Sequence, residues 1–131
     1  MPAVAEFAPG DHRHGSLAAG FHLVETYCGM PMRWSEPAAL VSLVVTHASR
    51  RIVIECAPVR SPLANLDLKF FINEFKVPRD ALAFADHRIV ITIEPTTMGT
   101  IRLAWICPPF TAIADRRRLG LPVLRIAVED R

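Results

Sequence analysis

Apolar and polar residues alternate along most of the chain, which is the repeat of β-strands. The clearest runs are residues 51–57, 87–93 and 100–107, in which every second side chain is apolar. Further runs of this kind cover residues 21–28, 40–46, 66–72 and 122–128. Successive side chains of a strand point to opposite faces, so each run predicts a strand with one buried face. On this pattern Trp105 points into the core, and the last strand buries Leu124, Ile126 and Val128 while Arg125 points outward.

The segments between the runs are rich in residues that end strands. Most of the 11 prolines lie there, and proline is rarely found inside a sheet because it lacks a backbone N–H. Asn73 and Glu74 predict a tight hairpin turn, since asparagine tolerates a positive φ. Residues 78–85 and 37–40 could each hold a helical turn. The pattern as a whole predicts an all-β fold, a single antiparallel β-sandwich of jelly-roll or immunoglobulin-like type with about seven or eight strands.

Length and composition indicate one globular domain. The chain has 131 residues, of which 51% are hydrophobic and 21% charged. A chain of this size buries well over half of its unfolded surface. We expect residues 1–18, with several glycines, to be a loose N-terminal segment, and residues 19–131 to form the β-sandwich domain. The sequence offers no long apolar stretch for membrane insertion and no signal peptide.

The net charge of +2 is too small for a nucleic-acid-binding surface, and the basic run at 116–118 is short. The three cysteines, Cys28, Cys56 and Cys107, lie in apolar, strand-like surroundings. Buried free thiols are expected there, which favours a reducing, cytoplasmic setting.

Several short motifs resemble a small β-sandwich domain that accompanies bacterial glycosyltransferases and other cell-surface polysaccharide enzymes. They are Phe21-His22-x-x-Glu25, Gly29, Met32-Arg33-Trp34-Ser35, the alternating segment 39–43, the hairpin 71–73 and the closing run Asp115-Arg116-Arg117-Arg118-Leu119-Gly120. The likeness covers roughly residues 20–129. Two positions depart from that pattern: Phe21-His22 stands in place of a glycine-aromatic pair, and Glu74 in place of a hairpin glycine. The resemblance implies a non-catalytic accessory module in glycan assembly or modification.

A ligand site is conceivable where Arg33, Trp34, Glu25, Asp115 and Arg117 come together. An indole face stacks on sugar C–H groups, and guanidinium and carboxylate groups bond hydroxyls. The alternative is a structural clasp in which Arg33 or Arg117 bridges Asp115 or Glu25 and Trp34 fills the edge of the core. Half-buried charges are costly unless they are paired, which favours the clasp.

Other chemistry finds little support in the sequence. Asp11, His12 and His14 lie close together, but zinc needs further protein ligands, and the remaining histidines match no metal spacing. No serine or cysteine stands in a nucleophile motif, so we predict neither a catalytic residue nor a cofactor. The leading hypothesis is therefore a non-catalytic accessory or carbohydrate-binding module, with a glycan or a glycosyltransferase as its partner. The alternative is a structural or assembly protein that forms a homodimer through a strand edge or an apolar face. A metal-dependent sandwich enzyme that uses the histidines is a third, weaker hypothesis.

Overall fold

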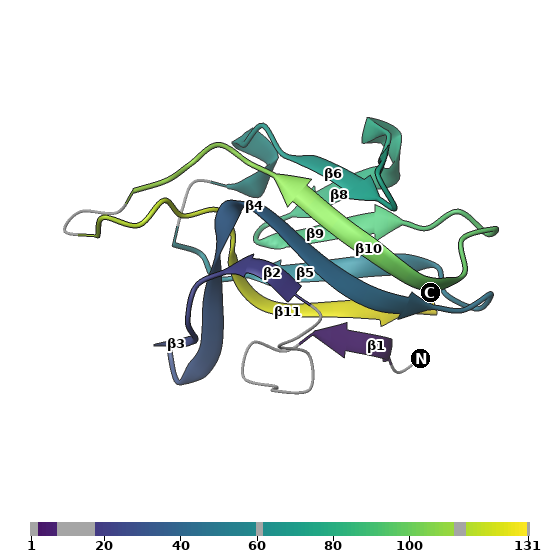
Figure 1. Ribbon diagram of the computed structural model, residues 1–131, viewed down its shortest axis with the longest axis horizontal. Helices are drawn as coiled ribbons and strands as arrows, with labels where there is room; N and C mark the ends of the chain where they lie inside the picture. Colours follow the sequence, from purple (N-terminus) through teal and green to yellow (C-terminus); the bar gives the residue numbers. More distant parts are fainter. Residues whose placement is uncertain (1–2, 8–17, 60–61, 112–114, 131) are drawn as a thin grey trace.

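The computed structural model describes residues 3–7, 18–59, 62–111 and 115–130. Within these residues the chain forms eleven strands, all paired antiparallel, and two short 3-10 turns (Figure 1). The strands are β1 (Ala3–Phe7), β2 (Ala18–Phe21), β3 (Glu25–Tyr27), β4 (Met30–Val45), β5 (Arg51–Cys56), β6 (Lys69–Ile72), β7 (Phe75–Lys76), β8 (Leu82–Ala85), β9 (Arg88–Thr92), β10 (Gly99–Ile106) and β11 (Pro122–Glu129), and the turns are η2 (Leu63–Asn65) and η3 (Arg79–Ala81).

The strands form one continuous, curled sheet in the order β7-β6-β10-β4-β11-β5-β9-β8. The predicted all-β, antiparallel class is confirmed. The finer prediction of a β-sandwich is not confirmed, because β4 pairs within both layers and joins them into one sheet. Arg33 and Trp34 of β4 pair with β11, whereas residues 38–45 of the same strand pair with β10. The result is a half-barrel, in which β2 and β3 lie along β4 and β1 lies along β11.

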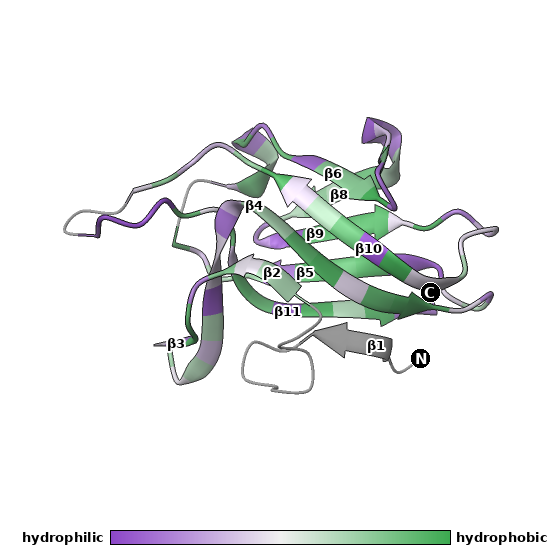
Figure 2. Cartoon of the chain, viewed as in Figure 1, coloured by the Kyte–Doolittle hydropathy of each residue, from purple (hydrophilic) through white to green (hydrophobic). Residues whose placement is uncertain are grey.

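The core lies between the layer that contains β4, β10 and β6 and the layer that contains β11, β5 and β9. The alternating apolar rows meet there, as the hydropathy colouring in Figure 2 shows along these strands. Trp105 is fully buried, with Phe70 and Phe21 against its ring at centroid distances of 6.2 and 5.8 Å. The inward orientation predicted for Trp105 is thus confirmed.

Ser35 holds the corner at which β4 passes from one layer to the other. Its hydroxyl accepts hydrogen bonds from Trp105 Nε1 at 3.2 Å and from the Leu121 backbone N–H at 2.9 Å. The same hydroxyl donates to the Glu36 carbonyl at 2.7 Å. The Ser35 backbone also exchanges hydrogen bonds with Gly120 and Leu121, at 2.6 and 2.7 Å. This buried set of bonds fixes where the segment after β10 joins the start of β11.

Most predicted strands match the structure, and the differences have local causes. The predicted helical turn at residues 37–40 is wrong, since this segment lies inside β4. Proline is tolerated at Pro37 because it stands between the segments that pair with β11 and with β10, and its carbonyl accepts from Cys107 N at 2.9 Å. In the other segment predicted to hold a helical turn, residues 78–85, the 3-10 turn η3 is present and is followed by the strand β8.

The hairpin turn predicted at Asn73 and Glu74 is confirmed. Their φ angles of 49° and 75° give the left-handed pair that a two-residue turn of type I′ requires. In β11, an irregularity between Val123 and Arg125 shifts the side-chain alternation by one position. Leu124 is consequently only half-buried, whereas Val123 is fully buried.

The N-terminal segment contains a strand. Ala3–Phe7, which lies within the segment predicted to be loose, pairs antiparallel with β11 as β1. Residues 8–17 of that segment lie outside the described residues, and with them Asp11, His12 and His14. Among the described residues, no helix has the length and apolar character needed to cross a membrane.

Candidate functional site

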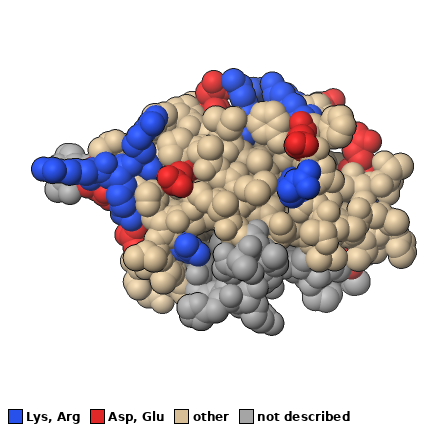
Figure 3. Space-filling view, in the orientation of Figure 1, with Lys and Arg blue, Asp and Glu red and all other residues tan. Residues whose placement is uncertain are grey.

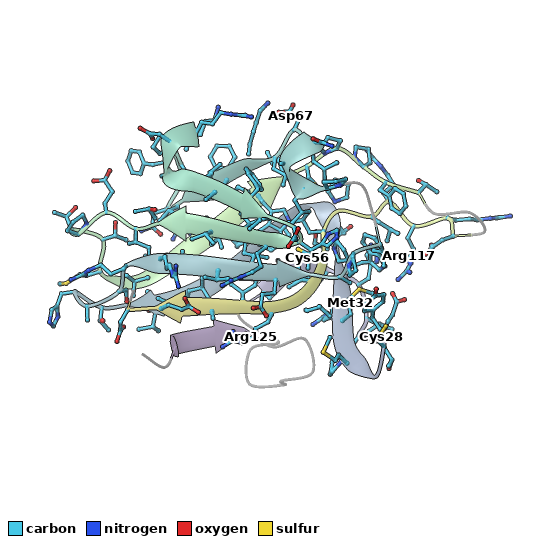
Figure 4. All side chains as sticks on the ribbon, turned by 180° about the vertical axis from the view of Figure 1, so that it is seen from behind. Cys28, Met32, Cys56, Asp67, Arg117 and Arg125 are labelled. Atoms are coloured by element: carbon cyan, nitrogen blue, oxygen red, sulfur yellow. The ribbon has the colours of Figure 1, made fainter. Side chains whose placement is uncertain are left out.

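Three of the predicted site residues, Glu25, Asp115 and Arg117, form an ion-pair cluster that we name the clasp. Arg117 Nη2 lies 2.7 Å from Asp115 Oδ2, and Arg117 Nε lies 3.0 Å from Asp115 Oδ1. Arg117 Nη1 lies 2.7 Å from Glu25 Oε2. Glu25 belongs to β3 and the other two belong to the loop between β10 and β11. The clasp therefore ties this loop to the hairpin of β3 and the start of β4, which we name the arm (Figure 4).

The loop is held in shape by backbone bonds as well. Phe110 and Leu119 exchange two backbone hydrogen bonds of 2.8 Å, so the loop closes on itself before it reaches β11. The Arg117 backbone N–H donates to Asp115 Oδ1 at 3.0 Å. Hydrogen bonds from the Arg117 side chain and backbone lower the pKa of Asp115 to about 2. The two carboxylates in turn raise the pKa of Arg117 above its ordinary value, so both partners are charged at neutral pH.

The other two predicted site residues do not join the clasp. Arg33 Nε donates to the His22 carbonyl at 2.6 Å, and its guanidinium carbon lies 5.6 Å from the centre of the Phe21 ring. Trp34 is only 6% exposed. Its indole is stacked on Phe110 at a centroid distance of 5.7 Å and an interplanar angle of 23°. A sugar would have to displace Phe110 to reach this face of Trp34.

Trp34 belongs to a second, smaller apolar cluster outside the main core. The buried members of this cluster are Met32, Trp34, Ala57 and Leu119. The sequence predicted that a structural clasp would pair charges and fill the edge of the core. In the structure Arg117 makes the ion pairs, and Trp34 fills the edge. The ligand-binding role of the five residues stays a prediction.

Arg116 and Arg118 flank the clasp and are exposed. Neither forms an ion pair with any other residue in the described part of the chain. Figure 3 shows Lys and Arg side chains gathered over the end of the molecule where this loop projects, with Asp and Glu side chains among them. The loop that the clasp anchors at Arg117 therefore carries, on either side of that residue, two exposed guanidinium groups with no ion-pair partner among the described residues.

A groove of about 790 Å³ lies elsewhere on the molecule, between the β6–β7 hairpin with η3 and the segment that joins β9 to β10. Pockets that bind small ligands have volumes of roughly 300–1,000 Å³. The lining is mainly apolar. Val77 and Ile93 are buried among the lining residues, whereas the Phe75 side chain is 79% exposed and Met98 is 60% exposed.

Three charged side chains, Lys76, Asp80 and Glu94, also line the groove. They are exposed and form no ion pair with other described residues. Asn73 Oδ1, by contrast, is engaged, since it accepts a hydrogen bond from the Arg102 backbone N–H at 2.9 Å. The groove thus offers an exposed aromatic ring beside three charged side chains that no other described residue pairs with. The groove could not be found from the sequence, because its two walls are about twenty residues apart in the chain and share no motif. The one sequence feature that pointed to it was an aromatic residue, Phe75, directly after the predicted turn.

The cysteines differ from one another. Cys28 is exposed, so the prediction that it is buried is wrong: it lies with Gly29 in the two-residue turn at the tip of the arm, at a φ of 49°. Cys56 and Cys107 are buried. Burial raises the pKa of the Cys56 thiol well above its ordinary value, with neighbouring Cys107 and Glu55 adding to the shift. No group of three or more His, Cys, Asp or Glu residues in the described ranges is placed to hold a metal ion.

A scan against models of protein families gives no match, and no curated protein sequence matches the chain.

Proposed function

We propose that the chain is a non-catalytic, carbohydrate-binding accessory module linked to bacterial surface-polysaccharide biosynthesis. The resemblance of its sequence motifs to modules of glycosyltransferases supports the class of partner. The groove supports the binding role, and we place the glycan there rather than beside Trp34. The observation that carries this proposal is the exposed Phe75 ring at a groove whose charged side chains form no ion pair with other described residues.

The chemistry of the groove fits a saccharide. The face of an aromatic ring is electron-rich and attracts the C–H groups on one side of a pyranose. Asp80 and Glu94 can accept hydrogen bonds from sugar hydroxyls, and Lys76 can donate them. Because these three side chains have no partner among the described residues, a ligand would not have to break an existing ion pair. The buried thiols Cys56 and Cys107 support a reducing, cytoplasmic setting for the module.

The proposal is tested by titrating the protein with a panel of neutral and uronic-acid oligosaccharides in a calorimeter. We expect millimolar or tighter binding of at least one of them. Phe75→Ala should raise its Kd about tenfold, because a stacked ring contributes on the order of 1 kcal/mol or slightly more. Ile106→Ala removes an apolar side chain that is 51% exposed on a different surface and serves as the control. If no oligosaccharide binds at millimolar concentration, or if Phe75→Ala binds as the wild type does, the proposal is wrong.

A homodimer is the second candidate, and exposed apolar residues on one outer face of the sheet favour it. On the outer face of β5 and β9, Arg51 pairs with Glu129 at 2.9 Å and Arg88 lies 4.0 Å from Glu55. The outer face of β4 and β10 carries one such pair, Arg102 with Glu74 at 3.8 Å, but also Val44 and Ile106, which are 52% and 51% exposed. Exposed apolar sheet faces of this kind are commonly covered by another subunit.

Light scattering over a range of protein concentrations tests the homodimer. The dimer hypothesis predicts a dimeric wild type, a monomeric Ile106→Lys variant, and no change for Ala83→Lys, which places the same charge on the exposed edge strand β8. A wild type that is monomeric at every concentration contradicts this second candidate and leaves the glycan proposal unaffected.

A further inference from the structure

Leu23 and Val24 are exposed at the same end of the molecule as the clasp, in a segment that is tied down on both sides. Leu23 is 84% exposed and Val24 is 51% exposed. On one side of the pair, His22 Nε2 donates to the Arg118 carbonyl at 3.2 Å. On the other side, Glu25 forms its ion pair with Arg117 at 2.7 Å. The two apolar side chains therefore project from a short segment that is held at both ends against the arginine-rich loop.

A third exposed apolar side chain lies on the arm. Met30 is 47% exposed and follows the two-residue turn at the arm's tip. Arm and loop project at the same end of the molecule (Figures 1 and 4), and the clasp joins them directly. Leu23 and Val24 thus lie between two contacts to the loop that carries Arg116 and Arg118, and Met30 lies on the arm that the clasp ties to this loop. Arg116 and Arg118 are exposed and form no ion pair with other described residues.

We propose that this end of the protein, formed by Leu23, Val24, Met30, Arg116 and Arg118, docks on the surface of a bilayer that contains anionic lipids. A bilayer interface is the one surface that presents phosphate groups next to an apolar layer. Guanidinium groups bind phosphate oxygens with charge-assisted hydrogen bonds, and the apolar side chains enter the boundary between headgroups and acyl chains. The protein lies on such a bilayer and does not span it.

The two arginines together with the exposed apolar side chains favour a bilayer over a soluble polyanion as the partner of this end. A polyanion would engage the arginines but leave Leu23 and Val24 in water. A purely apolar protein partner would cover Leu23 and Val24 but leave the two arginines without counter-charges. The bilayer surface uses both sets of side chains at once. This docking does not depend on the groove, which is lined by other residues.

The experiment is co-sedimentation of the full chain with vesicles of phosphatidylcholine alone and of phosphatidylcholine with phosphatidylglycerol in equal parts. We expect binding to the anionic vesicles that weakens as salt is added, because salt screens exposed charges. Each arginine near an anionic surface strengthens binding by about fivefold, so Arg116→Ser with Arg118→Ser should weaken it about 25-fold. Leu23→Ser with Val24→Ser should weaken it about tenfold or more.

Matched variants separate the proposed surface from general charge and general hydrophobicity. Arg50→Ser with Arg79→Ser removes the same charge from two other exposed arginines, and Val44→Ser with Ile106→Ser removes apolar side chains of similar exposure. Neither control pair should weaken vesicle binding by more than about twofold, because neither lies on the proposed surface and salt screens charges that lie far from the vesicle. All eight positions are at least partly exposed, so circular dichroism should show the wild-type fold in every variant.

Cys28 provides an independent readout, since it is exposed next to Met30 whereas Cys56 and Cys107 are buried. A polarity-sensitive dye attached to Cys28 should shift its emission to the blue on anionic vesicles but not on soluble polyglutamate. The proposal is overturned if the wild type does not bind anionic vesicles, or if the control pairs lose as much binding as the test pairs. It is also overturned if polyglutamate binds equally well and Leu23→Ser with Val24→Ser has no effect, since the end would then be a site for soluble polyanions.

Discussion

Replacing Ser35 by alanine removes the hydroxyl that holds the corner of β4, and the structure predicts a large loss of stability. Ser35 is fully buried. Its hydroxyl accepts from two N–H groups, Trp105 Nε1 and the Leu121 backbone, at 3.2 and 2.9 Å. In Ser35→Ala both donors lose this acceptor in a place that water does not reach. A buried donor left unpaired costs about 1–3 kcal/mol, so two of them should lower the free energy of unfolding by about 2–6 kcal/mol.

The assay is urea unfolding followed by circular dichroism and by the fluorescence of Trp105 and Trp34, with Ser42→Ala as the matched control. Ser42 lies on the same strand and is half-buried on the outer face. Its loss should change the free energy of unfolding by less than about 0.5 kcal/mol, as is usual away from buried contacts. If Ser35→Ala is no less stable than Ser42→Ala, the role assigned to the Ser35 hydroxyl is wrong.

Three further predictions concern the corner, the clasp and the cysteines. Gly120→Ala should destabilise the protein by about 1–3 kcal/mol in the same urea assay, because its methyl group would collide with the Glu36 carbonyl; wild-type stability would contradict this. The clasp should stabilise the fold fully above pH 3.8, the ordinary pKa of aspartate, and lose this contribution as the pH falls through about 2, because the pKa of Asp115 is lowered in the folded state. Unfolding measured against pH should therefore show a drop below pH 3.8 that is smaller in Asp115→Asn, and equal drops would refute the pairing. A thiol reagent at neutral pH should label Cys28 quickly and Cys56 only on unfolding, which mass spectrometry of the labelled peptides can verify.

The alternating rows of the core could be predicted from the sequence because burial on one face of a strand leaves a period-two pattern. Trp105 and the turn at Asn73 and Glu74 are examples. The course of β4 could not be predicted, because Glu36 and Pro37 have the composition of a strand end. They stand at a corner where the strand changes partners, and only the long-range bonds of Ser35 reveal it.

The candidate sites show a similar division. Opposite charges in short motifs indicated that Glu25, Asp115 and Arg117 belong together, and the structure pairs them. The sequence suggested that the indole of Trp34 is free to stack on a sugar. Its stacking partner in the structure, Phe110, is 76 positions away in the chain. The groove likewise depends on how two distant loops pack, which no local pattern encodes.

Chemical-shift mapping by NMR reveals whether the groove is the ligand site. During titration with the tightest-binding oligosaccharide of the panel, we expect shifts of backbone amides in residues 72–81 and 92–98, with the clasp and the arm unchanged. Shifts centred on Trp34 and residues 115–118, or no localised shifts at saturating sugar, would contradict it.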